Sequence, residues 1–144
     1  MTRTFSGDGI YIAQRDFQQI LLRGKGDGRF AETVNKEISL LPPKDNLRMI
    51  SNENFLFAKQ SFDQWSLICL KNKEEEELSK MINTMNSNDE ILASDCSYGQ
   101  AYFEFSGDKM KYYLNKLTHF DFRSKKFPPL TIAQTLIARI DCTI

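Results

Sequence analysis

The spacing of apolar residues predicts short strands followed by an amphipathic helix in the first third of the chain. "YIAQRD" (11–16) and "QQILLRG" (18–24) are rich in large apolar residues and lead into a glycine cluster, which is typical of strands. In "GRFAETVNKEISLL" (28–41) apolar residues recur at helical spacing, with Asp27 as the candidate N-cap, and the stripe comprises Phe30, Val34, Ile38 and Leu41. The prolines of "PPKDN" are expected to end this helix because proline has no backbone N–H to donate.

The middle of the chain alternates between strand and helix patterns. Residues 47–70 read as a strand region, broken by turn-forming residues at "SNEN" and around "SFD". "NKEEEELSKMINTMNS" (72–87) predicts a second amphipathic helix with acidic residues at its start, where the helix dipole favours negative charge. Its apolar stripe comprises Leu78, Met81, Ile82 and Met85.

The last third predicts two strands, a helix and a final strand. "ILASDCSYGQAYFEFSG" (91–107) reads as strand, turn and strand, with Ala101, Phe103 and Phe105 alternating to one face. Ser106 is the candidate cap of a third helix, whose apolar face holds Met110, Tyr113, Leu114 and Leu117. "TLIARIDCTI" (135–144) alternates as one half-buried strand, with its apolar side formed by Leu136, Ala138, Ile140, Cys142 and Ile144.

The predicted order of elements is β-β-α-β-β-α-β-β-α-β within a single domain spanning residues 1–144. Helices separated by pairs of strands favour an α+β fold with about three helices and a mixed or antiparallel sheet, covered on one face. The periodicities predict a core that includes Trp65, Ile68, Phe103, Phe105, Leu114, Leu136 and Ile140.

Composition and charge narrow the class of protein. Lysine plus arginine and aspartate plus glutamate both number 19, so no strong net field favours nucleic acid or an anionic membrane. The N-terminus lacks the apolar core of a secretory signal, and no apolar run approaches the length of a membrane span. Three widely spaced cysteines among apolar residues are typical of reduced core side chains, so we expect a cytoplasmic protein.

"LLRGKGDGRF" is the first candidate for chemistry, because a glycine-rich turn between a strand and a helix is the setting of a phosphate-binding loop. Gly24 and Gly26 match the first two glycines of GxGxxG, but Arg29 occupies the third position. The acidic residue expected about 20 positions further on is not convincingly present. A structural glycine turn explains the segment equally well, and we favour it.

The other polar candidates are weaker. His119 lies two residues from Asp121 and could act as a general base, but no nucleophile motif accompanies it. Asp95 and Cys96 are adjacent, yet nothing nearby would lower the pKa of the thiol. One histidine and no CxxC argue against an intrinsic zinc site, and the four glutamates read as a solvated helix start. The sequence therefore assigns no catalytic residue and no metal ligand, and leaves cofactor-binding residues unknown.

Several short motifs together resemble one family. "FDQWSLI" (Phe62–Ile68) is similar to the "PDEWLL" element of the gamma subunit of heterotetrameric sarcosine oxidase, and "LLRGKGD…LLPPKDN" fits that family's early "LRG…LP" pair. The family's run from "DVS" through "GxxAxxLLxxxxxLDL" to "FPxGxxAQTxLA" matches here at Asp95–Ser97, Gly107 to Leu117, Phe120–Phe122, Phe127–Pro128, and Ala133–Thr135 with Ala138.

The resemblance implies a role as well as a fold. It implies ferredoxin-like units, as in the folate-binding domain of the glycine-cleavage T protein, and a non-catalytic assembly subunit. Such complexes oxidatively demethylate sarcosine to glycine and pass the one-carbon unit to tetrahydrofolate. The partners would be larger flavoprotein alpha and beta subunits, which carry FAD, FMN, NAD and folate, and a small delta subunit that carries zinc.

One alternative is a stand-alone folate-binding or aminomethyltransferase-like domain, for which Gln100, Glu104 and Arg139 are candidate pterin contacts. The other alternative is a binding module with no link to amine oxidation. Two features depart from the family. Ser61 and Phe62 stand where the family has Gly-Pro, and the family continues beyond the point where this sequence stops, at Ile144. Residues 135–144 are therefore expected to form an open sheet edge that associates with another chain.

Overall fold

The computed structural model describes residues 2–144, and these form two compact units. The central unit comprises residues 17–100, and the terminal unit combines residues 2–16 with 101–144. The assignment of the whole chain to one domain stays a prediction. Within residues 2–144, no helix has the length and apolar character needed to cross a membrane.

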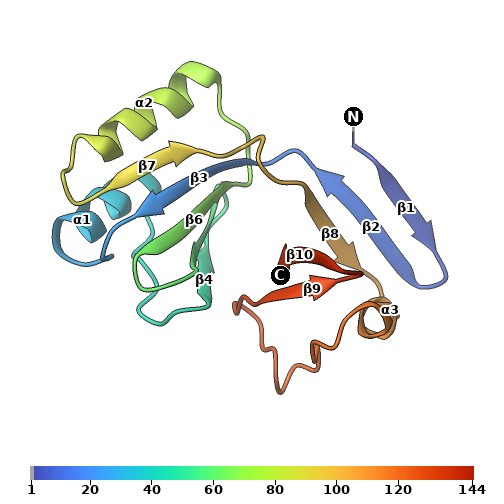
Figure 1. The fold of residues 1–144 in the computed structure, drawn as a ribbon. Helices are drawn as coiled ribbons and strands as arrows, with labels where there is room; N and C mark the ends of the chain where they lie inside the picture. Colours follow the sequence, from blue (N-terminus) through green and yellow to red (C-terminus); the bar gives the residue numbers. More distant parts are fainter. Residues whose placement is uncertain (1) are drawn as a thin grey trace. The chain divides into compact units, whose positions relative to one another are not determined.

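The central unit is a five-stranded antiparallel sheet with two helices (Figure 1). Its neighbouring strands follow the order β4-β5-β6-β3-β7. In chain order the elements are β3 (Gln18–Arg23), α1 (Gly28–Ile38), β4 (Arg48–Ser51), β5 (Phe55–Lys59), β6 (Gln64–Cys69), α2 (Glu75–Asn86) and β7 (Leu92–Asp95). Without β4, this is the β-α-β-β-α-β ferredoxin-like arrangement, and β4 adds a further edge strand.

The core of the central unit lies between one face of this sheet and the apolar stripes of α1 and α2. Alternate residues of the paired strands share this face, because the pairing sets Leu22 opposite Trp65 and Ile20 opposite Leu67. The buried cluster comprises Ile20, Leu22, Phe30, Val34, Ile38, Phe55, Phe57, Trp65, Leu67, Cys69, Leu78, Met81, Met85, Ile91 and Ala93. The helical spacings read from the sequence therefore place the two helix stripes correctly, except for Leu41, which lies outside α1.

The terminal unit holds a three-stranded antiparallel sheet, one helix and a separate hairpin. The sheet has the order β1-β2-β8, with β2 in the middle. The elements of the terminal unit are β1 (Thr4–Gly7), β2 (Ile10–Arg15), β8 (Tyr102–Ser106), α3 (Met110–Leu117), β9 (Gln134–Ile137) and β10 (Ile140–Thr143). All strand pairs in both units are antiparallel, so the expected α+β class with an antiparallel sheet and three helices is confirmed.

The loop after α3 is held by aromatic contacts. The rings of Phe120, Phe122 and Phe127 meet edge to face, with centroids 5.0 to 6.2 Å apart. Phe122 and Ile132 are each only 6% exposed, as is Leu114 on α3. Edge-to-face rings place the positive ring edge against the negative face of the next, which stabilises such clusters beyond their burial alone.

The prediction of one strand over residues 135–144 is wrong. The segment is a hairpin in which Ile137 pairs with Ile140, and Ala138 and Arg139 form its two-residue turn. Both turn residues have positive φ, 50° and 68°, as a type I′ turn requires. Apolar and polar residues alternate through the segment, but the turn reverses the chain, so Leu136 and Ile140 do not share one face. Association through this segment stays a prediction.

Several predicted core residues are not buried. Trp65 and Leu114 are in a core as predicted, and Ile68 and Phe105 are half-buried. Phe103, Leu136 and Ile140 are 55%, 53% and 67% exposed. In β8 the alternation placed Phe103 and Phe105 on one face correctly, but period alone does not say whether anything covers that face.

Helix ends also differ from the sequence expectation. Helix α1 ends at Ile38, where Ser39 adopts a left-handed conformation, so Leu41 lies outside the helix and is 64% exposed. Asp27 takes the N-cap position, but its backbone carbonyl rather than its side chain accepts the first helical bonds. Helix α3 has Lys109 at its N-cap, and the predicted cap, Ser106, is instead the last residue of β8.

Candidate functional site

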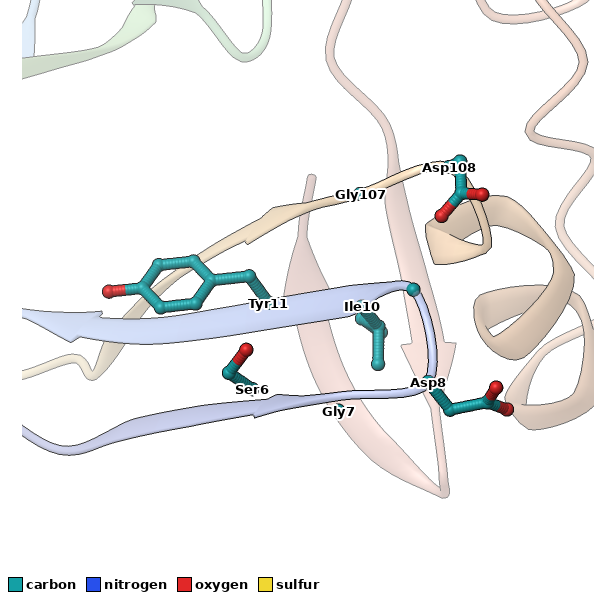
Figure 2. Close-up of a pocket in the computed structure, with 8 residues that line it drawn as sticks. Ser6, Gly7, Asp8, Ile10, Tyr11, Gly107 and Asp108 are labelled. Atoms are coloured by element: carbon teal, nitrogen blue, oxygen red, sulfur yellow. The ribbon is translucent and has the colours of Figure 1, made fainter.

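The first candidate site is a shallow cavity of about 270 Å³ at the β1–β2 turn of the terminal unit (Figure 2). The turn "GDGI" (7–10) reverses the chain through Asp8 and Gly9, both with positive φ, and the turn after β8 lies beside it. The lining comprises Ser6, Gly7, Asp8, Gly9, Ile10, Tyr11, Gly107 and Asp108. Figure 2 shows the Asp8 side chain directed from the turn toward α3.

Asp8 is the centre of a polar network on this turn. Its carboxylate accepts a hydrogen bond of 2.8 Å from Lys109 Nζ and another from the hydroxyl of Tyr113. The hydrogen bond from Lys109 lowers the pKa of Asp8, with Tyr113 acting in the same direction. The same contacts raise the pKa of Lys109 and of Tyr113. The protonated form of each group donates a hydrogen bond to the Asp8 carboxylate, and deprotonation would remove that bond.

Close backbone approach explains why glycines stand at this junction. A Cβ on Gly107 would lie 2.3 Å from the carbonyl oxygen of Gly9, and one on Gly9 would lie 2.5 Å from Oδ1 of Asp108. The N–H of Lys109 donates to that same carbonyl of Gly9, at 3.0 Å. The network therefore ties the start of α3 to the β1–β2 turn, which is a structural role that needs no ligand.

A second cavity, of about 280 Å³, lies between the sheet of the terminal unit and α3. Its lining is almost wholly apolar, and comprises Phe5, Gly7, Asp8, Ile10, Ile12, Phe105, Tyr113, Leu114 and Leu117. Ligand sites for small organic molecules typically measure about 300–1,000 Å³ and combine apolar walls with a few converging polar groups. This cavity is smaller, and Asp8 is already engaged by Lys109 and Tyr113.

The glycine-rich loop of the central unit packs on a tryptophan. Gly26 has φ +85°, and a Cβ there would lie 2.2 Å from the ring of Trp65. The Trp65 indole N–H donates to the carbonyl of Gly24, at 2.9 Å, and its ring lies 5.4 Å from the ring centres of both Phe30 and Phe57. The loop glycines therefore allow the chain to close over the core, as the structural-turn interpretation expects.

The start of α1 already has an anionic group beside it. The carboxylate of Glu90, from the loop before β7, accepts a hydrogen bond of 3.3 Å from the backbone N–H of Phe30. Helix N-termini attract anions because their first N–H groups lack helical partners. Glu90 already supplies an anionic partner to this helix start, so the geometry favours a structural role for this loop.

His119 and Asp121 do not form a dyad. His119 is exposed after the end of α3, whereas the Asp121 carboxylate is bound by the guanidinium of Arg123 at 2.6 to 3.0 Å. This hydrogen bonding lowers the pKa of Asp121 to about 2. The arrangement is a surface turn, in keeping with the surface interpretation of His119.

The cysteines occupy different environments. Cys69 is fully buried, and burial raises the pKa of its thiol to about 11, which leaves it protonated and unreactive at neutral pH. Cys96 and Cys142 are only half-buried, so the expectation of three core cysteines is correct for Cys69 alone. Beside Cys96, the Asp95 carboxylate accepts hydrogen bonds from the backbone N–H and the hydroxyl of Ser97, which stabilises a turn.

The candidate pterin contacts are all exposed side chains. Glu104, on β8, pairs with Arg15 at 2.7 Å, and Arg139 lies in the β9–β10 turn. Gln100 ends the central unit, whereas the other two belong to the terminal unit. Neither cavity described above is lined by any of the three, and their assignment stays a prediction.

Acidic residues at the start of α2 are solvated, as predicted. The first turn of the helix carries Glu75, Glu76 and Glu77, all exposed, and Lys73 pairs with Glu77 one turn further on. Within residues 2–144, no group of three or more His, Cys, Asp or Glu side chains is arranged to hold a metal ion.

Sequence reasoning missed the Asp8–Lys109–Tyr113 network. The partners lie 101 and 105 positions from Asp8, and β1 itself was not predicted. One local signal was available: "GDG" (7–9) after an alternating segment is typical of a two-residue hairpin turn. The contact with α3 has no local signal.

Comparison with known proteins adds a structural neighbour. No family model matches the sequence, and no curated protein is similar to it. Among solved structures, the fold is similar to a chain of the heterotetrameric sarcosine oxidase from Corynebacterium sp. U-96, determined in complex with pyrrole 2-carboxylate. The match has a TM-score of 0.80 with 12% sequence identity, and it covers 97% of this chain and 72% of that chain.

Proposed function

We propose that this protein is a non-catalytic assembly subunit of a sarcosine oxidase-type complex. The observation that carries the proposal is the fold, which matches a chain of such a complex over 97% of the present sequence. A second line of support is independent of the fold, because the short sequence motifs resemble the gamma subunit of that family. At 12% identity, the structural match alone supports the fold, and the motifs supply the reason for choosing this complex.

Residues of these motifs have structural roles in this chain. Trp65, in the "FDQWSLI" motif, is the largest fully buried side chain of the central unit and hydrogen-bonds the glycine-rich loop. Gly107, the first residue of the "GxxAxxLL" element, has φ +111° and packs against the backbone of Gly9. Motifs that specify packing are what an assembly subunit is expected to retain.

The proposed partners and cofactors follow from the same resemblance. The larger alpha and beta subunits would carry FAD, FMN, NAD and tetrahydrofolate, and a small delta subunit would carry zinc. The complex would act in the cytoplasm on sarcosine, oxidising its N-methyl group and releasing glycine. In this proposal the present chain contributes surface to the assembly, and the chemistry belongs to its partners.

Purification from the source cells tests the proposal. The chain, tagged at its N-terminus, is isolated by affinity and gel filtration, and the co-eluting chains are identified by mass spectrometry. We expect two larger chains with flavin absorbance to elute with it, together with sarcosine-dependent oxygen consumption in the same fractions. The chain produced alone is expected to be colourless and inactive with sarcosine.

Two outcomes would contradict this function. One is a tagged chain that elutes without any flavoprotein although flavoprotein subunits are present in the lysate. The other is stoichiometric binding of tetrahydrofolate by the isolated chain in calorimetry. That second result would favour the folate-binding alternative, and Gln100→Ala, Glu104→Ala and Arg139→Ala would then test the candidate pterin contacts.

A further inference from the structure

Strand β1 is an open edge of the sheet in the terminal unit. It pairs with β2 on one side, and Figure 1 shows it as the outermost strand, with β2 between it and β8. All four of its residues, Thr4–Gly7, are exposed, and Phe5 exposes 57% of its surface. An open edge strand presents backbone N–H and C=O groups that can pair with another chain.

The hydrogen-bond phase of β1 identifies which backbone groups point outward. Gln14 N–H donates to the carbonyl of Arg3, at 2.8 Å, so Arg3 faces β2. Because both polar groups of a residue in an antiparallel strand point to the same side, facing alternates along the chain. Phe5 and Gly7 therefore bond to β2, whereas Thr4 and Ser6 point outward. Among the interactions within residues 2–144, none uses the outward groups of Thr4 or Ser6.

The edge strands β4, β7 and β8 carry features that oppose pairing. On β7, the side-chain amide of Asn86 bonds both the N–H and the C=O of Ala93, at 2.7 and 2.9 Å, and so covers that edge. Edge strand β4 begins with Arg48, and β8 has Glu104 at its centre. Charged residues are common on edge strands because they discourage edge-to-edge pairing. Strand β1, with the sequence TFSG, has no charged residue and no such cover.

We propose that β1 is a self-association site and that it pairs, antiparallel, with β1 of a second copy of this chain. The phase described above restricts the register, because only outward-facing residues can exchange hydrogen bonds. In the register that meets this condition, Thr4 lies opposite Ser6 of the second copy, and Ser6 lies opposite Thr4 of the second copy. These two symmetry-related pairs would form about four backbone hydrogen bonds around a two-fold axis. Phe5 then lies on the axis, opposite its own counterpart.

The side chains fit this register. Phe5 and its counterpart would form a non-hydrogen-bonded pair, the closest type, with Cα atoms about 4.5 Å apart. Aromatic pairs in this position stabilise antiparallel sheets. The two-fold axis runs perpendicular to the sheet, so both rings lie on the same face, the one that borders the apolar cavity beneath α3. Pairing would cover the exposed Phe5 ring and the open side of that cavity with apolar surface.

This inference does not rest on the function proposed above. Sedimentation equilibrium of the full chain, from about 5 µM to 1 mM, is expected to show a monomer–dimer equilibrium. Phe5→Lys sets two charges against each other on the axis and is expected to raise the dissociation constant at least about tenfold. Phe62→Lys is the matched control, because Phe62 is 73% exposed in the turn before β6 of the central unit. Circular dichroism confirms that each variant is folded.

A charge-swap experiment tests the register itself. Phe5→Glu alone is also expected to be monomeric, whereas an equimolar mixture of Phe5→Lys and Phe5→Glu is expected to restore a dimer that dissociates in high salt. Restoration occurs only if residue 5 lies opposite residue 5. A second variant, Ser6→Pro, removes an outward N–H without touching the bonds to β2, and is expected to weaken the dimer as well.

Four results would overturn the proposal. The first is a wild-type chain that stays monomeric up to 1 mM. The second is equal loss of the dimer in Phe5→Lys and Phe62→Lys. The third is a dimer that survives Phe5→Lys but is lost in Ile140→Lys, which would place the contact on the β9–β10 hairpin. The fourth is failure of the charge-swap mixture to associate although the wild type does.

Discussion

The two units differ sharply in how much apolar surface they bury. In the central unit, a sheet face and two helix stripes enclose a continuous core around Trp65, Phe30 and Phe57. In the terminal unit the buried apolar residues are few: Ala13, Leu114, Phe122 and Ile132. Large apolar side chains such as Phe5, Phe103 and Ile140 are instead more than half exposed there. The amino-acid composition of the two units does not predict this difference in burial.

The contrast shows what covers a sheet. The central unit places two helices of 11 and 12 residues over five strands, so alternating apolar residues find partners on one face. The terminal unit has three strands and a single helix of 8 residues. Small assemblies of this kind bury a smaller fraction of their apolar surface. Exposed apolar patches on such a unit are typical of contact surfaces.

The largest expected effect lies in the central core. Trp65→Ala removes a side chain that is 1% exposed, and should lower the free energy of unfolding by about 3–5 kcal/mol. Urea denaturation followed by far-UV circular dichroism measures it, since the variant has no tryptophan fluorescence. Phe62→Ala, at a 73% exposed position, should change stability by less than about 0.5 kcal/mol. Equal losses in both variants would show that the central core does not carry this stability.

The terminal unit allows the same contrast between a buried and an exposed residue. Leu114→Ala, at a 6% exposed position on α3, should cost about 2–5 kcal/mol because it opens a cavity. Phe103→Ala, at a 55% exposed position, should cost less than about 1 kcal/mol. Amide exchange in β8 and α3 measures both effects within the unit. If Phe103→Ala were the more damaging change, the face occupied by Phe103 would be covered rather than open.

A glycine substitution tests the packing of the loop on Trp65. Gly26→Ala forces a positive φ on alanine and places its methyl group within 2.2 Å of the Trp65 ring, so it should cost about 1–3 kcal/mol. Gly99→Ala is the control, because its added Cβ would have no neighbour closer than 3.4 Å. Thermal unfolding of both variants gives the comparison. A neutral Gly26→Ala would mean that the loop moves freely away from the ring.

The smallest expected effect is electrostatic. Hydrogen bonds from Arg123 lower the pKa of Asp121 from 3.8 to about 2, so this carboxylate favours the folded state when it is ionised. Its contribution is present above about pH 4 and is lost as the pH falls toward about 2. The Arg123 side chain is 77% exposed, so solvent screens the effect. In Arg123→Gln, a carboxyl titration by NMR should give Asp121 the pKa of an ordinary aspartate. A pKa that stays as low as in the wild type would rule out Arg123 as the cause.

Much of the fold was predictable because its signals are local. The apolar stripes of α1 and α2 identified the two helices and the side that each one buries. The turn-forming residues at "SNEN" and "SFD" marked where one strand ends and the next begins. An apolar stripe on a helix is usually buried against a neighbouring sheet, so helical spacing predicts which side of the helix faces the core. No local constellation in the sequence pointed to a reaction, so the assignment of no catalytic residue stays a prediction.

The sequence by itself determined the periodic elements and the α+β class, because hydrophobic spacing and breaking residues act over a few positions. Only the tertiary structure decided that Glu90 meets the start of α1, that Asp8 joins Lys109, and that residues 135–144 reverse at Ala138. These contacts join positions far apart in the chain or hold ordinary residues at positive φ, so no local pattern encodes them. The exposure of Phe103 belongs to the same class, since a strand's period names a face but only its neighbours decide whether that face is covered.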